Sequence, residues 1–187
     1  MSKQIITHSR SLTNETEELL NQQIEMEGAS SASYLAMASW CDMKGYSTSA
    51  EFLYRHSDEE RMHMLKLFRY VNEAGGHAIY QGKSKVKHDF KNLREVFTLI
   101  LDHEIEVTRA INTLVDHCFG IKDFATVNFL QWYVTEQREE EVLARRAVEL
   151  FDIIGEDGIG LWTIDQEIGK LEGFAANTSL GPDAGGA

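Results

Sequence analysis

The stretch DEERMHML, residues 58–65, decides the fold because it places two polar side chains on what should be the apolar face of a helix. Glu60 and His63 stand three residues apart, so they lie one helical turn from each other on one face. The same face also carries Phe52, His56, Leu67 and Tyr70, which are apolar or aromatic apart from the histidine. A face of this composition packs against a core. A buried carboxylate and a buried imidazole both need partners, and other segments must supply them.

Three further segments show the same interruption of an apolar stripe. Apolar residues recur in each at alternating steps of three and four, which predicts a helix, and polar residues replace them near the middle. The stripes are Leu20, Ile24, Glu27, Ser31, Tyr34, Ala38, Cys41; Leu93, Val96, Ile100, Glu104, Val107, Ile111, Leu114, Cys118; and Leu130, Tyr133, Gln137, Glu140, Ala144, Val148, Phe151. None of these stripes contains a lysine or an arginine.

The ends of the helices follow from capping residues and glycines. Asn92 with Glu95 and Thr48 with Glu51 have the spacing of a capping box, and Gly45 can end the first helix. The predicted helices run from about Thr13 to Lys44, from Thr48 to the Gly75-Gly76 pair, from Asn92 to Gly120, from about Asp123 to Asp152, and, as a short piece, from Leu161 to about Phe174.

The connections between these helices define the topology. The first and third connections are short, which makes each joined pair antiparallel, whereas residues 75–91 are polar, aperiodic and long enough to cross a bundle. We therefore expect an all-α fold: an antiparallel four-helix bundle with one long crossover between the second and third helices and a short fifth C-terminal helix. Residues 1–174 are expected to form one domain and residues 175–187 a flexible tail.

Composition limits the possible partners and the compartment. A formal charge of −12 argues against nucleic acid and anionic membranes as partners and is compatible with attracting cations. The two cysteines, Cys41 and Cys118, form no CxxC pair, which favours reduced thiols. The start, MSKQIITHSR, lacks the apolar core of a signal peptide, and no uncharged run approaches the roughly 18 residues that span a bilayer. We expect a soluble, cytoplasmic protein.

The four interruptions lie near one level of the predicted bundle. Glu27, Glu60, Glu104 and Glu140 would therefore converge in the core, where burial of several like charges is costly. A salt-bridge network would need cations that the stripes lack, and protonated carboxylates sharing hydrogen bonds are a poor alternative. A pair of divalent metal ions fits better, and an oxygen-rich set with one imidazole suits Fe(II) or Mn(II).

At this point the sequence resembles the ferritin-like di-iron carboxylate proteins, and specifically bacterial non-haem ferritins. The resemblance rests on NQQIEMEGASSASYLAMASWC (21–41), FLYRHSDEERMHML (52–65), LDHEIEVT (101–108) and NFLQWYVTEQREEEVL (128–143). It implies a ferroxidase that oxidises Fe(II) with dioxygen or hydrogen peroxide and stores Fe(III) as a mineral. It also implies a homo-oligomer, a hollow cage of about 24 subunits.

The resemblance also implies roles for individual residues. At the implied di-iron centre, Glu27, Glu60 and His63 hold one iron. Glu60 bridges to a second iron, which Glu104 and Glu140 hold. Gln137 lies nearby. A third iron site is implied for Glu59, Glu136 and Glu139, with Glu140 shared. A solvated acidic face, in which Arg55 pairs with Glu59, is the alternative for these three acids. Tyr34 is either a core tyrosine or an electron donor beside the centre.

Departures from related families narrow the interpretation. Leu143 follows Glu140 where a second Glu-x-x-His motif would need histidine, and Arg61 stands where a haem-ligating methionine would follow Glu60, so we expect no haem. We assign His56, His77, His88, His103 and His117 to the surface or the core. Two other functions remain open: a non-storage di-iron oxidase or peroxidase on the same bundle, and a non-enzymatic helical interaction module with a polar core.

Overall fold

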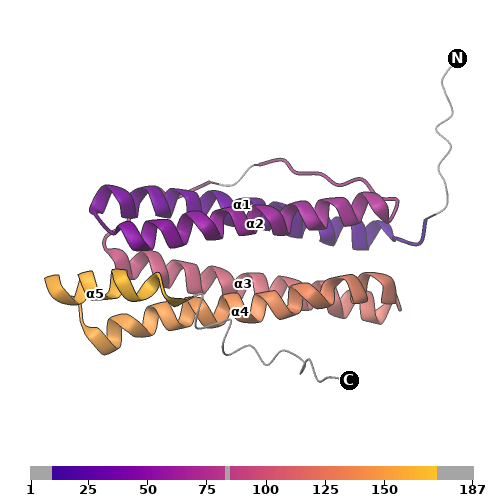
Figure 1. Cartoon of the computed structure of the whole chain (residues 1–187). Helices are drawn as coiled ribbons and strands as arrows, with labels where there is room; N and C mark the ends of the chain where they lie inside the picture. The colour runs from indigo at the N-terminus through magenta and orange to yellow at the C-terminus, as the bar shows by residue number, and fades with distance from the viewer. Residues whose placement is uncertain (1–9, 83–84, 172–187) are drawn as a thin grey trace, which may run out of the picture.

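The computed structural model describes residues 10–82 and 85–171, and this part of the chain contains five α-helices and no strand. The helices are α1 (Asn14–Lys44), α2 (Ser47–Glu73), α3 (Leu93–Gly120), α4 (Phe124–Ile154) and α5 (Gly158–Ile168). Figure 1 shows the α1–α2 hairpin lying along the α3–α4 hairpin, with α5 at one end beside α4. The predicted all-α bundle with a short fifth helix is therefore confirmed, whereas the predicted tail, residues 175–187, lies outside the described residues.

Three of the four long helices begin at side-chain caps. Thr13 Oγ1 accepts a hydrogen bond from the Thr16 amide at 3.1 Å, and Asn92 Oδ1 accepts one from the Glu95 amide at 2.9 Å. Asp123 caps α4 in the same way. At the far end of α1, Gly45 adopts a φ of 86°, a left-handed conformation that glycine adopts without strain. The predicted starts of α1 and α3 are correct because these caps are local in sequence.

The start of α2 differs from the prediction. The helix begins at Ser47, and its cap residue, Tyr46, makes no side-chain capping hydrogen bond, so the predicted Thr48–Glu51 capping box is wrong. Instead, Asp165 of α5 accepts hydrogen bonds from the amides of Ser49, at 2.8 Å, and Thr48, at 3.4 Å. A carboxylate from another helix therefore satisfies the free amides and the partial positive charge at this helix end.

The crossover between α2 and α3 runs back along the outside of the α1–α2 hairpin (Figure 1). Side chains at successive turns of α1 bind its backbone: Glu17 accepts from the His77 amide at 3.0 Å, and Asn21 accepts from the Ile79 amide at 2.9 Å. Glu25 accepts from the amides of Gln81 and Gly82. The crossover lacks periodicity because its backbone hydrogen bonds go to a neighbouring helix rather than to itself.

Gly28 allows the crossover to approach α1 closely. The ring of Tyr80 lies against this glycine, and a Cβ at position 28 would collide with it. A glycine in the middle of a helix costs roughly 1 kcal/mol relative to alanine. Close packing against Tyr80 explains why the chain carries this cost.

The apolar core consists of two separate clusters. One lies toward α5 and includes Leu53, Phe97 and Ile164, and the other lies toward the opposite end and includes Leu20 and Leu130. The buried polar side chains at mid-helix separate the two clusters. In the part of the chain that the structure describes, no helix combines the length and hydropathy that crossing a membrane requires.

Candidate metal centre

A belt of buried polar residues crosses the bundle between the two apolar clusters. Each of the four long helices contributes at least one member, at the level that the interrupted stripes predict. The members are Glu27 from α1, Glu60 and His63 from α2, Glu104 from α3, and Gln137 and Glu140 from α4; all are buried. Glu27 and Glu104, with exposed fractions of 0% and 1%, are fully removed from water.

The first predicted ligand group is assembled. Glu27, Glu60 and His63 each offer one potential ligand atom, and these three atoms lie within 4.8 Å of one another. His63 Nδ1 is 3.8 Å from Glu27 Oε2 and 3.6 Å from Glu60 Oε2. The buried Oε2 atom of Glu27 accepts no hydrogen bond from a donor among the described residues. A cation bound by the three side chains would satisfy this oxygen.

Glu104 does not belong to the group of Glu27, Glu60 and His63. Two neighbouring side chains, Tyr34 and Gln137, hold its carboxylate instead. Its Oε1 atom accepts a hydrogen bond from the Tyr34 hydroxyl at 2.6 Å, and its Oε2 atom accepts one from Gln137 Nε2 at 2.7 Å. Gln137 Nε2 also donates to the backbone carbonyl of Glu104, at 3.1 Å. The structure thus places Tyr34 and Gln137 in contact with a predicted ligand, and both orient its carboxylate.

Burial and mutual repulsion perturb two of the carboxyl groups. Burial, followed by the charge of Glu60, raises the pKa of Glu27 well above its usual value. The same two causes raise the pKa of Glu104 to about 8. Without a cation, burial therefore favours the protonated form of both carboxyls, and Glu104 holds its proton at neutral pH. A divalent cation would release those protons and compensate the buried charge.

Glu60 and His63 behave as a matched pair. Burial alone would raise the pKa of Glu60, but hydrogen bonds with His63 and Glu27 outweigh it, so the pKa is lowered. Burial alone would lower the pKa of His63, but the hydrogen bond and charge of Glu60 raise it. Glu60 is therefore the negative centre of the belt, and its charge acts on both Glu27 and Glu104.

Two acids of the predicted third site, Glu59 of α2 and Glu136 of α4, lie beside the belt. Ligand atoms of Glu59, His63 and Glu136 lie within 4.8 Å of one another, and so do those of His56, Glu59 and Glu140. Glu139 belongs to neither group. The Glu59 side chain is 43% exposed, which distinguishes it from the fully buried carboxylates of the belt.

His56 is the residue that sequence reasoning missed. Its imidazole is buried, stacks on Tyr34, and places Nδ1 3.2 Å from Glu140 Oε2 and 4.0 Å from Glu59 Oε2. Position 56 is four residues before Glu60 and seven before His63, on the same stripe of α2. That spacing was the available signal: it places His56 in the core on the inward stripe, while its contact with Glu140 is seen only in the structure.

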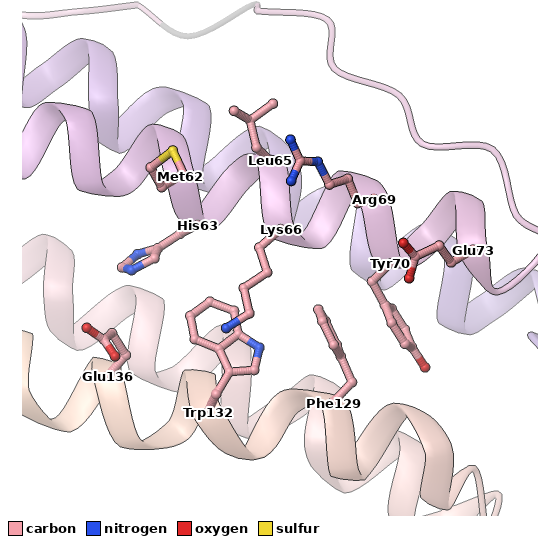
Figure 2. A pocket seen from close by; sticks show the side chains of 10 residues that line it. All are labelled: Met62, His63, Leu65, Lys66, Arg69, Tyr70, Glu73, Phe129, Trp132 and Glu136. Carbon is pink, nitrogen blue, oxygen red and sulfur yellow. The ribbon is translucent and has the colours of Figure 1, made fainter.

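A pocket of about 490 Å³ adjoins these groups between α2 and α4. Figure 2 shows His63 and Glu136 approaching each other from the two helices at one end of it. Aromatic rings form its floor: Tyr70 stacks on Phe129 with centroids 3.8 Å apart, and Lys66 Nζ lies 3.3 Å from the ring centroid of Trp132. His63 and Glu136 are thus accessible from this face, whereas Glu27 and Glu104 are not.

Comparisons with known proteins agree with this arrangement. The family model described as a Ferritin-like domain matches residues 17–154. The chain is 43% identical over 160 residues to a probable bacterial non-heme ferritin-like protein of Haemophilus influenzae, covering 86% of this chain and 97% of the relative. A bacterial non-heme ferritin of Campylobacter jejuni is also 43% identical, with 86% and 96% covered.

The solved structures that it is similar to include an open pore ferritin from the archaeon Archaeoglobus fulgidus. That structure superposes with a TM-score of 0.82 at 38% sequence identity, over 85% of this chain and 98% of that chain.

Proposed function

The chain belongs to the ferritin family, and from that premise we propose that it stores iron and is itself a ferroxidase. It would bind Fe(II) at the buried belt, oxidise it to Fe(III) with dioxygen or hydrogen peroxide, and retain the Fe(III) inside a homo-oligomeric cage. The observation that carries this proposal is the group of Glu27, Glu60 and His63, whose ligand atoms meet within 4.8 Å in the buried interior of the bundle.

The proposed roles follow from the geometry of the belt. Glu27 and His63 hold one Fe(II), and Glu104 and Glu140 hold a second. Glu60 bridges the two, because its charge acts on carboxylates of both groups. Tyr34 and Gln137 fix the carboxylate of Glu104 through their hydrogen bonds, which orients it for binding.

The reaction balances with these groups. Two Fe(II) ions each lose one electron, and dioxygen takes up both electrons with two protons to give hydrogen peroxide. Binding of Fe(II) to Glu27 and Glu104 displaces protons, because burial favours the protonated form of both carboxyls in the absence of metal. The protein contributes by holding both ions at reacting distance in a site from which water is largely excluded.

A third iron would be bound beside the centre by Glu59 and Glu136, with Glu139 as a further candidate and with His56 and Glu140 in reach of Glu59. Glu136 lines the α2–α4 pocket and the Glu59 side chain is 43% exposed, so this group can exchange ions with solvent more readily than the belt can. We propose it as the station between the di-iron centre and the mineral. No haem takes part in this scheme.

Glu60→Ala tests the centre. We expect loss of the fast oxygen-dependent step, followed by stopped-flow absorbance at two Fe(II) per subunit, without loss of the fold. Glu51→Ala, which removes an exposed carboxylate from the same helix, is the matched control and should oxidise iron like the parent. Unchanged initial oxidation in Glu60→Ala would remove the bridge from the proposal.

Assembly is tested separately. A cage of chains of 21.2 kDa should elute at roughly 500 kDa and retain iron after oxidation. Large apolar side chains that a lone subunit leaves exposed, such as Phe119, Phe124, Ile153 and Trp162, are candidates for the contacts between subunits. A monomer or dimer that still oxidises Fe(II) would indicate a non-storage oxidase on the same bundle. Protein that gains no stability from Fe(II) would favour an interaction module.

A further inference from the structure

A second pocket adjoins the belt from the opposite side. It has a volume of about 200 Å³ and lies between α1 and α3. Besides two lysines of the crossover, its lining consists of Ser33, Tyr34, Met37, Leu99, Ile100 and His103. It is distinct from the α2–α4 pocket, with which it shares no lining residue.

The inner end of this pocket is one side chain away from a proposed iron ligand. Tyr34 lines the pocket, is only 3% exposed, and donates its hydroxyl hydrogen to Glu104 at 2.6 Å. On the neighbouring wall, the Nε2 atom of His103 is 2.6 Å from Ser30 Oγ, so this imidazole nitrogen is already engaged in a hydrogen bond. Only the Tyr34 side chain therefore separates a small molecule in the pocket from the carboxylate of Glu104.

The chemistry of the lining excludes Fe(II) and admits a small apolar molecule. The described lining contains no carboxylate that could bind a divalent cation, and its basic side chains are Lys85 and Lys87, of which Lys87 pairs with Glu95 at 2.8 Å. The α2–α4 pocket also has two basic residues in its lining, but there the acids Glu73 and Glu136 accompany them. The acids Glu59 and Glu136, which can bind Fe(II), lie instead on the α2–α4 face. Met37, Leu99 and Ile100 offer an apolar surface, in which an uncharged apolar gas is favoured over an ion.

We propose that the α1–α3 pocket is the route by which dioxygen reaches the di-iron centre, while Fe(II) enters from the α2–α4 face. This inference rests on the proposed ferroxidase function. The two substrates would then approach the belt from opposite sides, each through a surface suited to its charge. Separate entry allows dioxygen to arrive after both Fe(II) ions are bound, without competing for their path.

Filling the pocket tests the proposal. Ser33→Phe adds a ring at its lining, and Ser39→Phe adds the same ring at an exposed position of α1 outside the pocket. Initial oxidation rates are measured by stopped flow at several dioxygen concentrations. We expect the second-order rate constant for dioxygen to fall about tenfold in Ser33→Phe, as 1.4 kcal/mol added to the barrier would produce, and to remain unchanged in Ser39→Phe.

Two further measurements separate dioxygen entry from other effects. Anaerobic calorimetric titration should give the same number and affinity of Fe(II) sites in Ser33→Phe as in the parent. Lys85→Glu should leave the dioxygen dependence unaltered, because dioxygen carries no charge. A weakened or slowed binding of Fe(II) in Ser33→Phe, or a changed dioxygen dependence in Lys85→Glu, would overturn the proposal in favour of a cation or anion route.

Xenon provides a test that needs no substitution. Crystals of the parent under xenon pressure should show the gas in the α1–α3 pocket, because xenon occupies apolar cavities. Absence of xenon there, or oxidation by Ser33→Phe at the parental rate at every dioxygen concentration, would refute the route. Failure of the ferroxidase function itself looks different: the unmodified protein would then bind no Fe(II) at the belt or would not oxidise it.

Discussion

Two regions of this bundle bury carboxylates to a similar degree and use them in opposite ways. At the α5 end, Asp165 is 3% exposed and accepts hydrogen bonds from the backbone amides of Thr48 and Ser49. At mid-bundle, Glu27 and Glu104 are equally buried but face other carboxylates, and burial together with the charge of Glu60 raises their pKa values. Burial alone therefore does not tell a structural acid from a metal-binding one.

The nature of the partners makes the difference. Asp165 meets a helix N-terminus, where free amides and the helix dipole favour a negative charge, so its burial stabilises the fold. The acids of the belt meet like charges, so their burial destabilises the metal-free protein until a cation is bound. Such a cost persists in a fold only where function requires it. Four predictions test this contrast.

Metal binding should have the largest effect. A ligand bound only by the native state, present at a thousandfold excess over its dissociation constant, raises the free energy of unfolding by about 4 kcal/mol. We expect Zn(II), as a redox-inert probe, or anaerobic Fe(II) to raise the melting temperature of the parent accordingly. Glu60→Ala should lose most of this increase, and Asp165→Asn should keep it. Equal increases in all three proteins would contradict the contrast.

Removal of the structural acid should come next. Asp165→Ala leaves the amides at the start of α2 without their acceptor, and we expect a loss of about 2 to 3 kcal/mol in the free energy of unfolding. Urea unfolding of the metal-free protein at fixed concentration measures it. Glu167→Ala, at an exposed position of α5, is the matched control and should change stability by less than about 0.5 kcal/mol. An Asp165→Ala protein as stable as this control would show that the cap does not matter.

The third prediction concerns the pH dependence of the free energy of unfolding. The expected effect is smaller and comes from Glu104, an acid of the belt. Its pKa rises from an ordinary value of 4.5 to about 8 on folding, so the folded protein retains a proton that the unfolded chain has lost. This contribution to stability is complete below pH 4.5 and is lost as the pH rises through 8. Metal-free protein should therefore lose about 1 to 2 kcal/mol between neutral and mildly alkaline pH.

The Glu104→Gln variant tests whether Glu104 causes this pH dependence. Glutamine keeps the size of the side chain and an oxygen that can accept from Tyr34, but it cannot ionise. The variant should lose less stability over the same pH interval in urea titrations, and metal-free Glu104→Gln should be at least as stable as the parent at alkaline pH. A slope identical to that of the parent would mean that other groups cause the pH dependence.

Much of this arrangement was predictable because it depends on local sequence. The caps at Thr13 and Asn92 lie within three residues of the amides they accept from, and the helical period places Glu27 and Glu104 at one level. The Thr48–Glu51 prediction failed because the true cap, Asp165, is 116 residues from Ser49 in sequence. No local pattern carries a contact of that kind.

Two other features depend on the assembled fold in the same way. Gly28 is explained by Tyr80, which the crossover brings against α1. The hydrogen bonds from Tyr34 and Gln137 to Glu104 depend on side-chain directions, which the helical period does not specify. His56 could have been predicted from its place on the α2 stripe, but periodicity alone does not distinguish a core histidine from one that contacts a carboxylate cluster.

The smallest effect on stability is expected where carboxylates are neither buried nor capping. Glu59 is half exposed, and its ligand atom lies within 4.8 Å of those of His63 and Glu136. The double change Glu59→Gln with Glu136→Gln keeps size and hydrogen-bonding capacity but removes two charges. Because solvent screens these groups, we expect the free energy of unfolding to change by less than about 0.5 kcal/mol.

The same double variant should nevertheless change iron binding. Anaerobic calorimetric titration should show one fewer tightly bound Fe(II) per subunit than in the parent, while stopped flow shows the same rapid oxidation of the first pair, since Glu27, Glu60 and Glu104 are untouched. Glu73→Gln, an exposed acid that lines the α2–α4 pocket outside both ligand groups, controls for the loss of charge on that face. An unchanged number of sites in the double variant would reduce these acids to a solvated face and leave the buried belt as the whole of the metal centre.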